Sequence, residues 1–174
     1  MAVRDVLVYP HPALKQVAPE LATHDEITRE ERERVASLAQ DLLETMRSHP
    51  GCVGLAATQL GEMTRMIVVD VTDHRKTTTC HGLLLLLNPI VRSSSGAEVA
   101  REGCLSIPQL TANVRRATSI VLEARTPEGE EVQIETEGFE ARCLLHEIDH
   151  LDGILFLDRV DSLTSDVFRR KSYR

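Results

Sequence analysis

Two histidines in the last third of the chain, His146 and His150, stand four residues apart, and Glu147 follows the first of them. On a helix that turns about 100° per residue, side chains four apart differ by about 40° in direction, so both imidazoles can bind one metal ion. Glu147 lies about 60° from His150 around the same helix and can take a proton from a water molecule beside that metal. This HExxH pattern therefore predicts a helix and is typical of metal-assisted hydrolysis.

The residues around this pattern favour a helix at the edge of a hydrophobic core. Leu144, Ile148 and Leu151 recur at helical intervals and mark a buried flank. The alternative is a surface helix that carries two histidines by chance, which the apolar flank disfavours. We expect the helix to run from about residue 139 to 151 and to end at Gly153, because glycine tolerates the left-handed conformation of a helix terminus.

The rest of the chain predicts one more helix and several strands. Thr28 and Glu31 have the spacing of a capping box and Pro50 ends the apolar periodicity that follows, so this helix covers about residues 30–47. Short aliphatic or β-branched runs between turn formers predict strands at 66–71, 83–87, 118–124 and 131–135, the last two joined by a hairpin turn at 126–129. The expected fold is α+β, a mostly antiparallel sheet packed around the central metal-binding helix, with an additional N-terminal helix.

Length and charge narrow the class of protein. A chain of 174 residues fits a single domain, 1–174, in which about residues 160–174 form a basic C-terminal tail. The 20 Lys and Arg against 27 Asp and Glu give a net charge of −7, so no global positive field would hold DNA. No apolar stretch approaches the about 18 residues that span a membrane. The cysteines follow no secreted disulfide framework, and we expect a cytosolic protein with reduced thiols.

A catalytic metal site usually has three protein ligands, so a third must come from outside the helix. Beyond His150 the chain offers aspartates but no His or Glu, which disfavours a common zinc endopeptidase. Upstream, Cys104 follows Gly103, and Cys80 adjoins His81 in a predicted turn. A thiolate suits zinc or iron. Residue types alone do not decide which of these upstream residues is the third metal ligand. No second Cys or His pair matches Cys80 and His81, so we favour a plain loop there.

Three segments together resemble the signature motifs of peptide deformylases, in order and in spacing. They are 54–59 (GLAATQ), 102–106 (EGCLS) and 146–151 (HEIDHL). The likeness extends over nearly the whole chain, and only the last fifteen or so residues look idiosyncratic. The resemblance implies an enzyme that removes the formyl group from N-formylmethionine at the start of nascent polypeptides, releasing formate.

The resemblance also implies roles for particular residues. The metal ligands would be Cys104, His146 and His150, with Glu147 as general base and acid. The side-chain amide of Gln59 and the backbone N–H of Leu105 would donate to the formyl oxygen as negative charge develops on it. Further implied residues are Gly54, whose backbone would pair with the substrate, Val53, Phe139 and Cys143 in an apolar methionine pocket, and Glu102 with Arg116 as a brace for the cysteine loop.

The cofactor would be one divalent metal ion. Judged only by its ligands, two imidazoles and a thiolate, the site suits zinc. The resemblance instead implies Fe²⁺ in the cell, which Ni²⁺, Co²⁺ or Zn²⁺ often replaces in purified protein. It also implies a location in a bacterial cytoplasm or an organellar matrix. In some family members a basic C-terminal segment contacts the ribosome, but for this tail we favour a solvated helix end.

Two positions depart from the family pattern. Cys52 stands where the first motif usually opens with Gly, and Leu145 stands where Gln usually precedes the histidines. Neither is an implied ligand, base or oxyanion donor, so we expect activity to survive, with Cys52 a small buried residue. Two alternatives remain: a zinc endopeptidase, and a degenerate deformylase-like binding module whose metal is structural. The presence of Glu147 and Gln59 argues against the second alternative.

Overall fold

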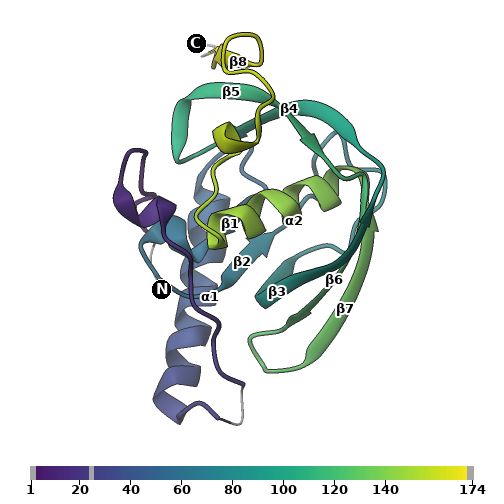
Figure 1. Cartoon of the computed structure of the whole chain (residues 1–174). Helices are drawn as coiled ribbons and strands as arrows, with labels where there is room; N and C mark the ends of the chain where they lie inside the picture. The colour runs from purple at the N-terminus through teal and green to yellow at the C-terminus, as the bar shows by residue number, and fades with distance from the viewer. Residues whose placement is uncertain (1–2, 24–25, 172–174) are drawn as a thin grey trace.

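The computed structural model describes residues 3–23 and 26–171, and it is an α+β fold with two antiparallel sheets (Figure 1). The helices are α1 (Arg29–Ser48) and α2 (Gly138–Leu151), with short 3₁₀ turns at Pro12–Lys15, Ala57–Leu60 and Phe156–Arg159. One sheet has the order β1-β2-β3-β6-β7: Gly54–Ala56, Met66–Val69, Leu84–Ser95, Ser119–Arg125 and Glu131–Glu137. The other has the order β4-β5-β8: Glu98–Cys104, Ile107–Arg116 and Val167–Arg169. The expected fold class is confirmed.

Helix α1 forms where its capping signals predicted it. The Thr28 side chain accepts a hydrogen bond from the Glu31 backbone N–H (3.2 Å), and the Thr28 N–H donates to the Glu31 carboxylate (2.8 Å). These two bonds satisfy N–H groups that have no partner inside the helix. The predicted range, 30–47, agrees with the observed helix to within one residue at each end.

The five-stranded sheet separates the two helices, and β2 is buried on both faces. Met66 and Val68 pack in the cluster that contains the apolar face of α1. Ile67 and Val69 point the other way, into the cluster shared with α2. All four side chains are buried, which explains why this strand reads as a continuous apolar run rather than an alternating one.

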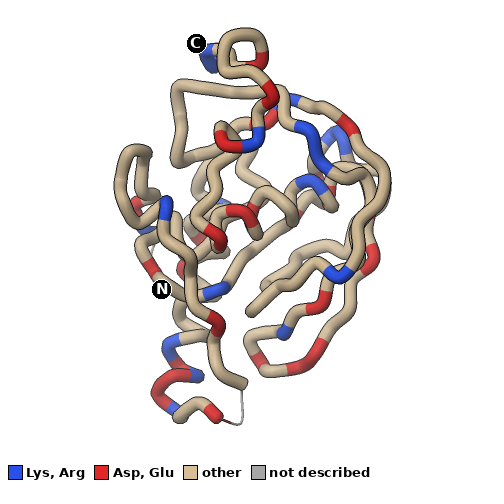
Figure 2. The backbone as a smooth tube through the Cα atoms, in the orientation of Figure 1, with Lys and Arg blue, Asp and Glu red and all other residues tan. Residues whose placement is uncertain are grey.

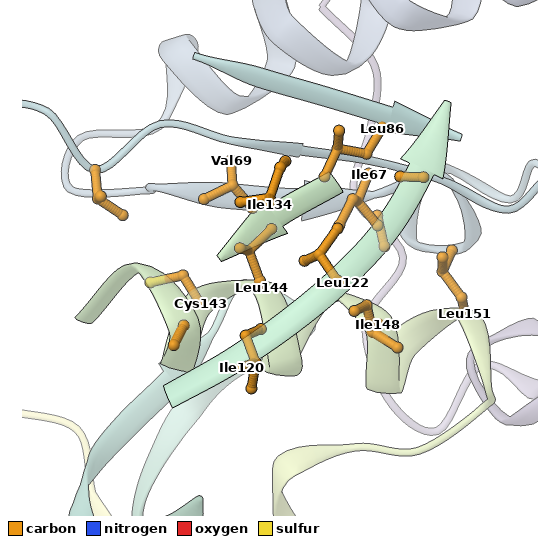
Figure 3. Close-up of a cluster of buried hydrophobic side chains, with 14 residues drawn as sticks. Ile67, Val69, Leu86, Ile120, Leu122, Ile134, Cys143, Leu144, Ile148 and Leu151 are labelled. Atoms are coloured by element: carbon orange, nitrogen blue, oxygen red, sulfur yellow. The ribbon is translucent and has the colours of Figure 1, made fainter. Parts of the chain in front are cut away.

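Helix α2 lies against the sheet through an apolar face (Figure 3). Leu144, Ile148 and Leu151 contact a cluster that includes Ile120 and Leu122 of β6. Burying an aliphatic side chain of this size contributes about 1.5–3 kcal/mol, so this face fixes the rotation of the helix. The rest of the helix, with its two histidines, is thereby turned toward the β4–β5 hairpin. None of the helices in the described ranges is long and apolar enough to cross a membrane.

Several predicted strand bounds were wrong or incomplete. The strand predicted at 83–87 continues as β3 to Ser95, because its polar half still pairs with β6 through the backbone. Strands β1, β4 and β5 were not predicted. The C-terminal tail does not form the expected helix end: β8 pairs with β5, with Leu110 opposite Arg169 and Ala112 opposite Val167. Residues 172–174 of that tail lie outside the described residues.

Candidate active site

The structure brings Cys104, His146 and His150 together in the interior. Cys104 ends β4, and the two histidines lie one turn apart on α2. One ligand atom from each lies within 4.8 Å of the other two, and all three residues are buried. The Cys104 Sγ is 3.2 Å from the Nε2 of His150. A register shift between Gly103 and Cys104 interrupts the β4–β5 pairing at the cysteine.

The donor set fits a divalent transition metal. Burial alone would raise the pKa of the Cys104 thiol, but the neighbouring His150 and His146 outweigh it and hold that pKa well below its usual value. A metal ligand must be a thiolate, so the site favours the form that binds. His146 makes a 2.9 Å hydrogen bond through Nδ1 to Glu102, which leaves its Nε2 for the ion. The Nδ1 of His150 is buried and has no hydrogen-bond partner among the described residues.

The other candidates for the third ligand lie elsewhere. His81 follows a loop after β2, where its backbone N–H donates to Glu140 (2.8 Å) and its Nδ1 lies 2.7 Å from the same carboxylate. The Cys80 thiol contacts Thr72 at 3.9 Å. Glu140 is buried near the start of α2 and also accepts from Thr136. The pair therefore belongs to a loop anchored on α2, as the sequence favoured, and it takes no part in the metal-ligand group.

Glu147 lies in the same cleft with a free oxygen. Its Oε2 is buried without a hydrogen-bond partner among the described residues. Burial raises the pKa of Glu147 to about 7. Gly54 lies directly against it, since a Cβ at Gly54 would be 2.6 Å from Oε1. The carboxyl group is therefore able to take up and release a proton near neutral pH. A side chain at position 54 would displace it.

Gln59 points its amide group toward Cys104. Its Oε1 accepts from the Ala56 N–H (2.9 Å), and its Nε2 donates to Ser106 Oγ (3.0 Å) and to Cys104 Sγ (3.4 Å). The bond from Ala56 fixes which end of the amide faces the cleft. Leu105 also lines the cleft. The sequence did not predict that Ala56 and Ser106 orient the Gln59 amide. Neither an alanine backbone N–H nor a lone serine marks a site in a sequence.

The remaining predicted site residues line one cleft of about 320 Å³. Val53, Gly54, Phe139 and Cys143 contribute to its wall together with Glu147. The Phe139 ring stacks on His74, with ring centroids 4.1 Å apart. Burial raises the pKa of Cys52, which also lines the cleft, to about 12. Its thiol is neutral at physiological pH, which argues against a second nucleophile. The expectation of a buried residue was wrong, because Cys52 is half-buried in the cleft wall.

A buried network of ion pairs supports His146 from behind. The predicted pair of Glu102 and Arg116 is confirmed, with a two-point contact at 2.7 and 3.0 Å. Arg142 also bonds Glu102 (2.8 Å), and Arg116 reaches Asp149 (2.8 Å). Sequence reasoning missed Arg142 and Asp149. The available signal was their spacing, because with His146 they stand at i, i+4 and i+7 along one face of α2.

The departure at Leu145 leaves this network intact. The Leu145 side chain is half-buried and packs against the apolar cluster between α2 and the sheet. It contacts the core, and the hydrogen bond between His146 and Glu102 does not involve it.

Comparisons with known proteins point to a single family. A family profile described as polypeptide deformylase matches residues 3–166. The peptide deformylase of Rhizobium meliloti is 41% identical over 172 residues, covering 98% of this chain and 92% of that protein. That of Syntrophobacter fumaroxidans is 39% identical over 171 residues, covering 98% of this chain and 94% of that protein.

Solved structures of peptide deformylases superpose on this fold. The Thermotoga maritima enzyme gives a TM-score of 0.80 at 32% identity and covers 93% of this chain and 100% of that chain. A class I type b enzyme of Acinetobacter baumannii with Met-Ala-Ser bound gives 0.81 at 30% identity, covering 91% of this chain and 100% of that chain. The chain therefore belongs to the polypeptide deformylase family, metal-dependent enzymes that remove the N-formyl group from nascent peptides.

Proposed function

We propose that this chain hydrolyses the formamide bond of N-formylmethionyl peptides in the cleft between β1, β4 and α2. Cys104, His146 and His150 would hold one metal ion there. The observation that carries the proposal is the convergence of these three donor atoms beside a buried carboxylate, Glu147, whose second oxygen has no partner among the described residues. A purely structural metal site would need no such carboxylate.

The protein groups have complementary roles in this reaction. A divalent metal bound at the site supplies a Lewis acid that makes water acidic enough to lose a proton near neutral pH. Glu147 accepts that proton while the water oxygen bonds to the formyl carbon, and it delivers the proton to the amine nitrogen when the carbon–nitrogen bond breaks. The amide of Gln59 and the backbone N–H of Leu105 donate to the formyl oxygen as negative charge develops on it. The products are formate and a peptide with a free N-terminal methionine.

The cleft binds the peptide through its backbone and its first side chain. The backbone of Gly54, at the first residue of β1, pairs with the peptide as an added strand. Val53, Phe139 and Cys143 contact the methionine side chain, and their apolar surface suits a thioether. Met-Ala-Ser bound to the similar Acinetobacter baumannii enzyme supports a peptide that begins with methionine as the ligand.

For the native metal we propose Fe²⁺. A ligand set with one thiolate and two imidazoles binds Fe²⁺, Ni²⁺, Co²⁺ or Zn²⁺, so the choice rests on the family resemblance rather than on the donors. The substrate exists only where translation begins with formylmethionine. We therefore place the protein in a bacterial cytoplasm or an organellar matrix. Contact of its basic C-terminal tail with the ribosome stays a prediction, to be tested by co-sedimentation of the full chain with ribosomes.

The proposal is tested by formate release from formyl-Met-Ala-Ser, with acetyl-Met-Ala-Ser and a peptide blocked at both ends as controls. We expect formate from the first peptide and no cleavage of the third. Cleavage of internal bonds in the blocked peptide without formate release would indicate an endopeptidase. Binding of the formylated peptide without any product would indicate a binding module.

A further inference from the structure

Positive charge gathers at the mouth of the cleft although the whole chain is acidic. Lys76, Arg101 and Arg170 line the cleft, while the net charge of the chain is −7. Within the described ranges, 3–23 and 26–171, no carboxylate lies within 4.0 Å of any of the three cations. The carboxylates in the cleft wall are Glu102, which is held by two arginines and His146, and Glu147 at the reaction centre.

Arg170 reaches this mouth from the end of the chain. Its backbone N–H, directly after β8, donates to the Gln109 carbonyl (2.8 Å). Its guanidinium lies on the backbone of Gly103, where a Cβ would collide with Arg170 Nη2. Gly103 directly precedes Cys104. The guanidinium of Arg170 therefore lies over the residue of β4 that directly precedes Cys104, a proposed metal ligand.

Arg101 stands beside it on the same face of β4. Residues two apart on a strand share a face, so Arg101 and Gly103 both point outward, whereas Cys104 points inward and is buried. The Arg101 guanidinium lies 3.5 Å from the centre of the Phe168 ring. Its Nε also donates to Asn113 at 3.1 Å. We call Arg101 and Arg170 the cationic ledge. Strand β8 positions both, because Phe168 contacts Arg101 and Arg170 directly follows the strand. Figure 2 shows blue backbone at the end of β8, which pairs with β5.

An extended peptide in the cleft passes this ledge. Gly54, with which the peptide backbone pairs in the proposed function, and Gly103, beneath Arg170, both line this cleft. Each extended residue advances about 3.3 Å, so Arg101, three residues before Cys104, stands roughly 10 Å from the metal ligand along β4. With the formyl group at the metal-ligand group, the second and third peptide residues lie roughly 7 and 10 Å from it, within reach of a long arginine side chain. Lys76, near the Phe139 ring at 5.6 Å, adds positive potential.

We propose that the cationic ledge selects formylated peptides with an Asp or Glu side chain at the second or third position. This inference rests on the proposed placement of the reaction in this cleft. Guanidinium groups bind carboxylates through paired N–H donors, and neither arginine has a carboxylate partner among the described residues. An exposed pair of this kind changes binding by about fivefold, and salt weakens it.

The test compares formyl-Met-Ala-Glu-Ala, formyl-Met-Ala-Gln-Ala and formyl-Met-Ala-Lys-Ala. All are amidated at the C-terminus, so that only the side chain at position three carries charge. A second series has Glu, Gln or Lys at position two. We expect kcat/KM to fall in the order Glu, Gln, Lys in at least one series. The Glu-to-Gln ratio should be about fivefold, arise from KM, and shrink in high salt.

Variants assign the effect to the ledge. Arg170→Gln and Arg101→Gln should each move the Glu-to-Gln ratio toward one. Arg169→Gln is the control. It removes the same charge, but Arg169, the last residue of β8, does not line the cleft, so the ratio should stay unchanged. Equal rates on all peptides, or a ratio unaffected by both ledge variants, would overturn the inference. Absence of formate from the neutral Gln peptide would instead overturn the proposed function.

Discussion

At Gly54 a hydrogen atom in place of a side chain leaves the space that the Glu147 carboxylate occupies. A Cβ there would lie 2.6 Å from Oε1. The resemblance to deformylases implied that Gly54 pairs with the substrate backbone, and the structure adds a second reason for glycine at this position. Because burial raises the pKa of Glu147 to about 7, its carboxyl group is suited to transfer protons near neutral pH.

Replacement of Glu147 by Gln should abolish most turnover without emptying the site. An amide cannot accept the proton, and general acid-base groups typically contribute about 10²–10⁴-fold in rate. Glu147 is not in the metal-ligand group, so the metal content should match that of the unmodified protein. The measurement is kcat for formate release, with metal analysis on the same sample. A loss of less than about tenfold would sink the role assigned to Glu147.

Replacement of Cys104 by Ala should empty the site or weaken metal binding strongly. A methyl group cannot replace a thiolate ligand, and only two imidazoles would remain. Cys143→Ala is the matched control, because this cysteine is also buried and lines the same cleft but is not in the ligand group. Metal analysis after dialysis decides between them. Retention of metal by Cys104→Ala, or its loss from Cys143→Ala, would contradict the assigned ligand set.

Among the elements, helices were predictable and the second sheet was not. The bounds of α1 and α2 follow from local signals, such as the capping box at Thr28 and the apolar periodicity before Gly153. The inner face of the β4–β5 hairpin mixes apolar residues, such as Ala112 and Val114 of β5, with charged ones. The charged residues at inward positions are Glu102 and Arg116, which are buried because they pair with each other. A pattern based on apolar alternation cannot identify such strands.

The capping box should contribute measurably to the stability of the fold. Thr28→Ala removes one oxygen acceptor from the start of α1, and the loss of such a cap typically costs about 1 kcal/mol. Ser37→Ala is the control, since Ser37 is exposed in the middle of the same helix and alanine is a good helix former. The free energy of unfolding in urea should fall for the first variant only. Equal stability of the two variants would show that the cap contributes nothing.

In the whole molecule, the site lies where the two sheets meet α2. The proposed metal ligands come from β4 and α2, and the neighbouring glycine comes from β1 of the other sheet. The resemblance predicted these residues because the motifs carry them in order. It could not predict Arg170 at the cleft mouth, because that placement depends on the pairing of β8 with β5 and not on a motif.

The metal-loaded forms of the protein should differ in activity and in sensitivity to air. We expect the iron form to be active and to lose activity in air, because Fe²⁺ and the thiolate of Cys104 can oxidise. The nickel form should be active and keep its activity, and the zinc form should be a poorer catalyst. Iron, nickel and zinc forms prepared anaerobically are compared by formate release before and after exposure. An iron form that is no more active than zinc and is stable in air would indicate a zinc hydrolase.

The claim that a single metal ion at Cys104, His146 and His150 supports deformylation is tested most directly by titrating metal-free protein with nickel(II) while following formate release from formyl-Met-Ala-Ser. The account predicts no turnover without metal, a linear rise, and a plateau at one equivalent per chain, because one group of three converging ligands serves the reaction. Cys104→Ala should stay inactive throughout the same titration. Full turnover by the metal-free protein, or a rise that continues to a second equivalent, would contradict the account.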